Sequence, residues 1–196
     1  MSKKSLALLI SLVLVIGVVA GSTVAWLVAT DVEVVNTFSP STIKIDLSEE
    51  NKGVNYDFKM VPGTTMAKDP KVVVEEGSEP CWLFIAVDAS ENLDTFIEYA
   101  ISNDWTPYST YTNIYYREVG TALIGDPLYI LKGQGDGVYA NGFVTVNDNI
   151  TESDMEGIAT NKPTLTFNAC AVQRANIGDV DTAWGAADAT FKGLAK

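Results

Sequence analysis

Histidine is absent from the 196 residues of this chain, and cysteine occurs only twice. Without histidine the chain cannot form HExxH metalloprotease sites, histidine-ligated zinc or iron centres, or the serine–histidine and cysteine–histidine pairs of nucleophilic enzymes. A pair of carboxylates, as in glycosidases, is the remaining route to catalysis, and no pattern in the sequence brings such a pair together. We therefore predict that the protein is not an enzyme, with no catalytic residues, no cofactor and no metal site.

Positive charge is also scarce, because 13 lysines and arginines face 25 aspartates and glutamates, for a net charge of −12. A surface this acidic repels phosphate backbones. We therefore do not expect nucleic acid as a partner. The acids cluster in two places without the ligand order of a calcium-binding EF-hand loop. We expect both clusters to be solvated, and they comprise Asp46, Glu49, Glu50, Glu75, Glu76 and Glu79.

The N-terminal region has almost no charge. After two lysines at its start, the chain has no charged residue until Asp31, and Leu6 to Ala20 is strongly apolar. A basic start, an apolar middle and small residues at the cut are the layout of a secretory signal. The predicted cleavage places Thr23 at −3 and Ala25 at −1, so that the exported chain begins at Trp26. The expected partner in this step is a signal peptidase, and the expected location is outside the cell.

An uncleaved membrane anchor is the alternative for the same region. Residues 5–30 are uncharged and long enough to span a bilayer. The lysines before this segment and the acids after it would still leave the body outside. Contact with a membrane is expected only through this segment.

An extended segment follows the predicted cut. From 26 to 38 the residues alternate, with Trp26, Val28, Thr30, Val32 and Val34 on one side of the segment. Branched residues at period two are typical of a half-buried strand rather than a helix. This strand could pair within its own subunit as an edge strand, or with another copy of the chain.

The rest of the chain is predicted to be all-β. Short alternating or apolar runs are separated by turn signals, and the most hydrophobic of them, Cys81 to Val87, is expected to be a central strand. One short helix begins at Thr151 with Asp154 completing a capping box, and a final helix is capped by Asp179 or Asp181. The predicted organisation is a signal helix over 1–25, an extended segment over 26–40, and a two-sheet β-sandwich of jelly-roll or Greek-key type over 41–196. The expected strands are 43–47, 55–60, 71–75, 81–87, 96–101, 113–119, 128–131, 142–146 and 164–173.

The two cysteines fall on opposite faces of the predicted strands. Cys81 shares a face with Leu83 and Ile85, which we expect in the core, whereas Cys170 shares a face with Thr166 and is expected to point outward. Residues on opposite faces of one sheet cannot meet the geometry of a disulfide. We expect two free thiols, with a disulfide as the alternative if a bulge changes one face.

Several motifs, in order, resemble the TasA/camelysin family of exported proteins from Gram-positive bacteria, which are processed by SipW-type signal peptidases. The export segment ends in Gly-Ser-Thr-Val-Ala, followed by Trp26 and Asp31. Asn36-Thr37-Phe38 then precedes the 43–47 strand, and Val61-Pro62-Gly63 leads through Lys68-Asp69-Pro70 into Cys81-Trp82-Leu83-Phe84. The likeness covers the signal, about the first third of the body, and the closing strand from Pro163 to Gln173.

The resemblance implies a jelly-roll body and extracellular fibres of the biofilm matrix. In such fibres the freed N-terminal segment of one subunit completes the sheet of its neighbour, in a head-to-tail homopolymer, and other matrix proteins are further candidate partners. Mapped onto this chain, the donor residues are Trp26, Val28, Val32, Val34 and Phe38. The camelysin name implies metalloprotease activity, which the absence of histidine argues against.

A monomeric surface module that binds glycans or peptides is the alternative function. Aromatic side chains stack on sugars when they are exposed, but in a β-sandwich they more often fill the core or an interface. The residues that decide between these roles are Trp82, Phe84, Trp105, Tyr108 and Tyr111.

Overall fold

The computed structural model describes residues 3–7, 10–11, 13, 42–49, 60–134, 139–158 and 161–196. The chain divides into two units, Met1–Ser39 and Pro40–Lys196. In the first unit the described residues are helical. The predicted cleavage site and the whole donor segment lie outside the described residues. No helix in the described ranges combines the length and the apolar character needed to cross a membrane.

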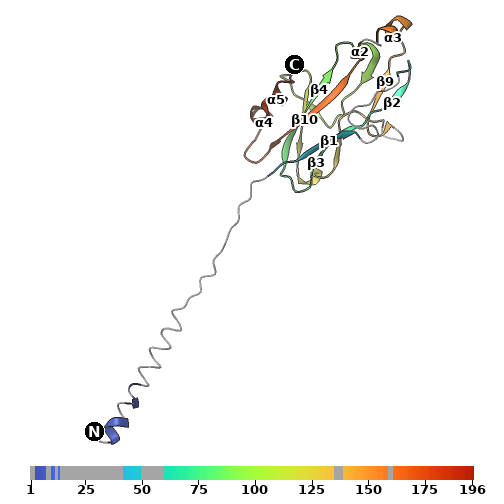
Figure 1. Ribbon diagram of the computed structural model, residues 1–196. Coiled ribbons are helices and arrows are strands. Elements are labelled where there is room, and N and C mark those ends of the chain that lie inside the picture. The colour runs from blue at the N-terminus through green and yellow to red at the C-terminus, as the bar shows by residue number, and fades with distance from the viewer. Residues whose placement is uncertain are drawn as a thin grey trace. The chain divides into compact units, whose positions relative to one another are not determined.

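The second unit is predominantly β, and its described strands form three antiparallel sheets (Figure 1). The first sheet has the order β1 (Ile45–Glu49), β3 (Pro70–Val74), β8 (Pro127–Tyr129). The second has the order β10 (Leu165–Gln173), β4 (Cys81–Ala89), β7 (Ile114–Val119), β6 (Thr106–Pro107). The third has the order β2 (Thr65–Ala67), β9 (Phe143–Val146), β5 (Ile97–Tyr99). The helices are short: α2 (Leu93–Phe96), a 3₁₀ turn (Thr121–Leu123), α3 (Glu152–Ile158), α4 (Val180–Ala186) and α5 (Ala189–Lys192).

The predicted β class is confirmed, but the described strands make three sheets where the sequence predicted two. The additional division arises at Lys68 and Asp69, which separate β2 from β3. The N–H of Lys68 donates to the Gly142 carbonyl beside β9, whereas the Pro70 carbonyl accepts from Ile130 after β8. One continuous stretch of chain therefore passes from the third sheet into the first. An isolated bridge between Ile101 and Leu131 joins the same two sheets again.

Strand β4 is the centre of the fold, as its apolar run predicted. All its side chains from Cys81 to Val87 are buried, because both faces of the sheet are covered. Cys81, Leu83 and Ile85 pack on the residues of β3 and β8, in a cluster that we call the inner core. Trp82 and Phe84 point the other way, into a second cluster beneath the C-terminal helices, which we call the aromatic core.

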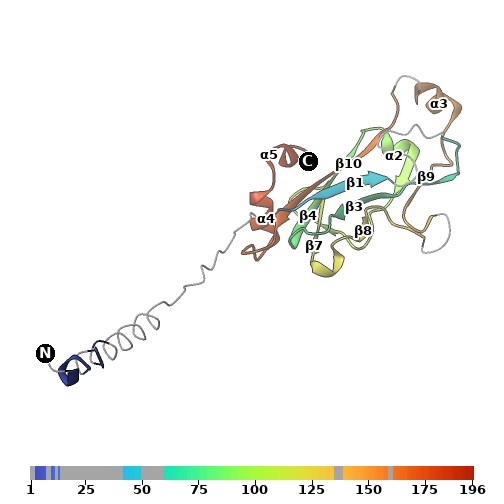
Figure 2. The same cartoon turned by 60° about the horizontal axis from the view of Figure 1, so that its bottom comes forward.

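The C-terminal helices cover the outer face of the second sheet (Figure 2). The predicted single helix is wrong, because the chain turns extended at Ala187 and then starts again at Asp188. The Asp188 carboxylate accepts hydrogen bonds from the N–H groups of Thr190 and Phe191, which begins the second helix. Asp179, rather than Asp181, caps the first helix by accepting from the Thr182 N–H at 2.8 Å.

The capping box predicted at Thr151 is present. The Asp154 carboxylate accepts the Thr151 N–H at 2.9 Å, and the Asp154 N–H donates to the Thr151 hydroxyl at 3.2 Å. These reciprocal bonds start α3 at the expected residue, and its last residue, Ile158, packs on the third core cluster, between the third sheet and α2.

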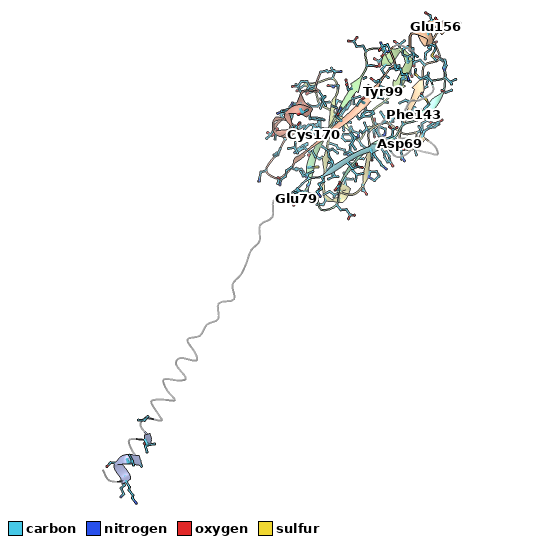
Figure 3. The ribbon with its side chains drawn as sticks, in the orientation of Figure 1. Asp69, Glu79, Tyr99, Phe143, Glu156 and Cys170 are labelled. Atoms are coloured by element: carbon cyan, nitrogen blue, oxygen red, sulfur yellow. The ribbon has the colours of Figure 1, made fainter. Side chains whose placement is uncertain are left out.

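Cys170 does not point into solvent, which corrects the prediction. It does lie on the opposite face of the sheet from Cys81, but that face is covered, and Cys170 is half-buried against the aromatic core near α5 (Figure 3). The sequence placed the residue on the right face and missed that helices cover this face. Both thiols are free.

We expect the thiols to stay free and unreactive in the folded protein. Burial raises the pKa of Cys81 to about 11, and burial likewise raises the pKa of Cys170. At pH 8 only about one Cys81 in a thousand is then a thiolate, the form that reacts. Intact-mass analysis without reductant should show two alkylated cysteines after unfolding in urea and none under brief native labelling. A mass lower by two hydrogens, with no alkylation after unfolding, would mean that a disulfide forms.

Candidate assembly site

Strands β1 and β10 are each the last strand of their sheet, and they lie beside one another without pairing (Figures 1 and 2). The register of each strand pair shows which backbone groups of β1 and β10 form no hydrogen bond with the neighbouring strand. The Glu75 N–H donates to the Lys44 carbonyl, so the alternate residues Ile45, Leu47 and Glu49 direct their N–H and C=O groups away from β3. In the described part of the chain, no strand is hydrogen-bonded to this outer edge of β1.

The outer edge of β10 is arranged in the same way. The Arg174 N–H donates to the Pro80 carbonyl and the Ser90 N–H to the Thr164 carbonyl, which fixes the even-numbered residues as the ones bonded to β4. The odd-numbered residues therefore present their backbone groups outward, and no described strand pairs with them. They are Leu165, Phe167, Ala169, Ala171 and Gln173.

The core is incompletely covered along this side. In its middle, Val72, Val74, Leu83 and Ile85 are fully buried. At the β1–β10 side, by contrast, the apolar side chains that pack on the inner core are only partly buried. They are Ile43, Ile45 and Leu47 from the β1 side and Phe167, Ala169 and Ala171 from β10. We call the partly buried apolar side of the body formed by these six residues the β1–β10 groove.

A charged pair closes one end of the groove. The Lys68 ammonium lies 3.0 Å from Glu49 Oε2, with the two side chains only 13% and 11% exposed, respectively. The same ammonium lies 5.9 Å from the centre of the Phe167 ring on β10. The second carboxylate oxygen, Glu49 Oε1, is buried and finds no hydrogen-bond donor among the described residues. A buried acceptor without a donor is uncommon in native proteins and costs free energy.

The opposite side of the first two sheets is closed by side chains. The indole N–H of Trp105 donates to the Tyr129 carbonyl on β8 at 2.8 Å. The guanidinium of Arg117, on β7, lies 5.5 Å from the centre of the Trp105 ring. Trp105 is 3% exposed and belongs to the inner core. The described residues thus join β7 to β8 on that side.

The aromatic residues considered as a sugar-binding platform are not available for stacking. Trp82, Phe84, Trp105 and Tyr108 are buried, and Tyr111 packs against Trp184 with ring centres 5.3 Å apart. The expectation that aromatic side chains of a β-sandwich fill the core therefore holds for these residues, because α4 and α5 cover all of them except Trp105, which lies in the inner core.

The predicted site residues themselves lie outside the described residues. This holds for Thr23 and Ala25 at the cleavage site and for the donor residues Trp26, Val28, Val32, Val34 and Phe38. Among the described residues no three potential metal ligands of the types histidine, cysteine, aspartate and glutamate lie together. The sequence does not predict a site at the groove residues. The alternation of Ile43, Ile45 and Leu47 indicates only a strand with one apolar face.

Comparisons of the chain with family models, with curated proteins and with solved structures each gave no match. A proposal for function therefore depends on the sequence motifs and on the geometry of the β1–β10 groove.

Proposed function

We propose that this protein is an exported structural subunit of the TasA/camelysin type that assembles into extracellular fibres of the biofilm matrix of a Gram-positive bacterium. A SipW-type signal peptidase releases the chain at Trp26, and the body acts as an open jelly-roll sandwich whose missing strand comes from the next subunit. The role is structural and requires no catalytic centre.

The observation that carries the proposal is the β1–β10 groove. Two adjacent edge strands, whose outer backbone groups pair with no described strand and whose apolar side chains are half-buried, form a template for an added strand. An incoming strand supplies main-chain hydrogen bonds to an edge strand, and its alternate side chains complete the core. Each Val side chain that becomes fully buried contributes about 1.5–3 kcal/mol.

The segment 26–38 has the required pattern. Its predicted inner side carries Trp26, Val28, Val32 and Val34, and Phe38 lies at its end. Donation from one copy into the next is a head-to-tail contact that does not close on itself, so it produces a filament. While the signal is uncleaved, the membrane tethers the donor segment and restrains assembly. Cleavage therefore acts as the switch.

Light scattering on a purified chain that begins at Trp26 tests the proposal. We expect scattering that grows with concentration and time, and filaments in negative-stain microscopy of the same sample. A chain that stays monomeric at high concentration would contradict fibre formation. A monomer whose sedimentation shifts on adding polysaccharide would instead support the alternative of a glycan-binding surface module.

A further inference from the structure

Strands β1 and β10 lie too close together to admit a third strand between them. Some of their Cα atoms come within 8 Å of one another. Because neighbouring strands of a sheet lie about 4.8 Å apart, a strand that enters between two edges needs those edges about 9.6 Å apart. A strand can therefore enter between them only after β1 and β10 have moved apart.

Lys68 bridges the two strands at one end of the groove. Its N–H donates to the Gly142 carbonyl at 3.2 Å, which fixes its backbone beside β9 of the third sheet. Its ammonium lies 3.0 Å from Glu49 Oε2 on β1 and 5.9 Å from the centre of the Phe167 ring on β10. One side chain thus links the first sheet to the second from a backbone that is held by the third.

This bridge is shielded from water. The Lys68 and Glu49 side chains are 13% and 11% exposed, whereas two other ion pairs of the described residues, Arg174–Glu118 and Lys196–Asp88, have side chains that are 46% exposed or more. Salt and water screen a shielded pair much less than a surface pair. Separating Lys68 from Glu49 would leave a mostly buried carboxylate without its counter-ion, which costs free energy. Movement of β1 away from β10 is therefore opposed at this end.

We propose that Lys68 is a latch, which holds β1 against β10 in the free subunit and must open before a strand is added. This inference rests on the proposed strand donation. The latch slows assembly without preventing it, because the main-chain hydrogen bonds and buried side chains of the added strand offset the loss of one ion pair. It gives the exported subunit a kinetic barrier that delays polymerisation.

Two substitutions of Lys68 should change the assembly rate in opposite directions in a chain that begins at Trp26. Lys68→Met removes the charge that contacts Glu49 and Phe167, and we expect the lag before light scattering rises to shorten about fivefold. Lys68→Arg keeps the charge, can bond to both carboxylate oxygens and stacks well on an aromatic ring, so its lag should be at least as long as that of the unsubstituted chain.

Loss of stability is a second route to faster assembly, so two controls are matched to Lys68→Met. Ile114→Val trims a fully buried side chain of the aromatic core and lowers the free energy of unfolding away from the latch. Arg174→Met removes one positive charge from the exposed pair with Glu118. Neither control should change the lag.

Hydrogen exchange measures the latch in the absence of assembly. In monomer kept below the concentration at which the chain polymerises, the amides of β1 should exchange about fivefold faster in Lys68→Met, because the Glu49 end of the strand is released. The amides of β4 should be unaffected. If Lys68→Met does not fold, Glu49→Gln takes its place, since it keeps the shape of the side chain and loses the charge, and the same directions are expected.

Three results would overturn the inference while strand donation stands. They are unchanged exchange of the β1 amides, a lag that Ile114→Val shortens as much as Lys68→Met does, and a shorter lag for Lys68→Arg. Failure of the unsubstituted chain to assemble at any concentration would instead reject the proposed function, and the role of the latch with it.

Discussion

A shortened chain that begins at Asn36, and so lacks residues 26–35, should remain a folded monomer and form no fibres at concentrations where the intact exported chain polymerises. The deletion removes Trp26, Val28, Val32 and Val34, the side chains proposed to complete the core of the neighbouring subunit. The receiving body should be unaffected, because its described sheets and core clusters are built from residues after Pro40. Assembly is therefore expected to fall below detection while the thermal unfolding midpoint changes little.

The result is read from two measurements on the same samples. Light scattering and negative-stain microscopy report assembly, and circular dichroism reports the fold. A matched control replaces the segment by a scrambled sequence of equal composition, which keeps the charge and length but loses the alternation. Continued polymerisation of the deletion variant would show that the donor assignment is wrong, whereas loss of the fold would show that the segment pairs within its own subunit.

Phe84→Ala should lower the free energy of unfolding by about 3–5 kcal/mol, the largest effect that we expect from a single substitution. Phe84 is fully buried in the middle of β4. Its ring centre lies 5.4 Å from that of Trp184, 6.4 Å from Tyr108 and 6.3 Å from Tyr116. Truncation opens a cavity between the sheet and the C-terminal helices and removes aromatic contacts that also stabilise α4.

Urea denaturation of the monomer, followed by tryptophan fluorescence, measures this loss. Val61→Ala is the control, because Val61 is 55% exposed and its truncation should change stability by no more than about 0.5 kcal/mol. Since small domains are stable by only about 5–15 kcal/mol, the Phe84 variant should unfold at much lower urea concentration. A loss below about 1 kcal/mol would mean that the aromatic core does not hold the helices on the sheet.

Much of the body could be predicted from local pattern. The alternation of residues 164–173 predicted β10, and the apolar run of Cys81 to Val87 predicted a central strand. Period two also assigned Cys81 and Cys170 to opposite faces of the sheet, and the structure agrees. These features depend on residues a few positions apart, so they can be read along the chain.

Other features depend on contacts between distant segments. The sequence predicted that Cys170 would point outward, because a polar-facing row next to Thr166 resembles a solvated face. In the structure the segment after Asp179 folds back over that row. The burial of Trp184 and Phe191 in one aromatic core depends on where the two helices pack, and no local period of the sequence predicts that packing.

The sequence by itself determined that this is an acidic, histidine-free β protein with an apolar start, an alternating segment from Trp26 to Phe38, and two cysteines on opposite strand faces. Only the tertiary structure decided which strands are edges. Whether β1 and β10 end their sheets depends on which segments pair with them, and pairing joins residues far apart in the chain. For the same reason the ion pair of Glu49 with Lys68 could be found only after folding brought β1, β10 and Lys68 together.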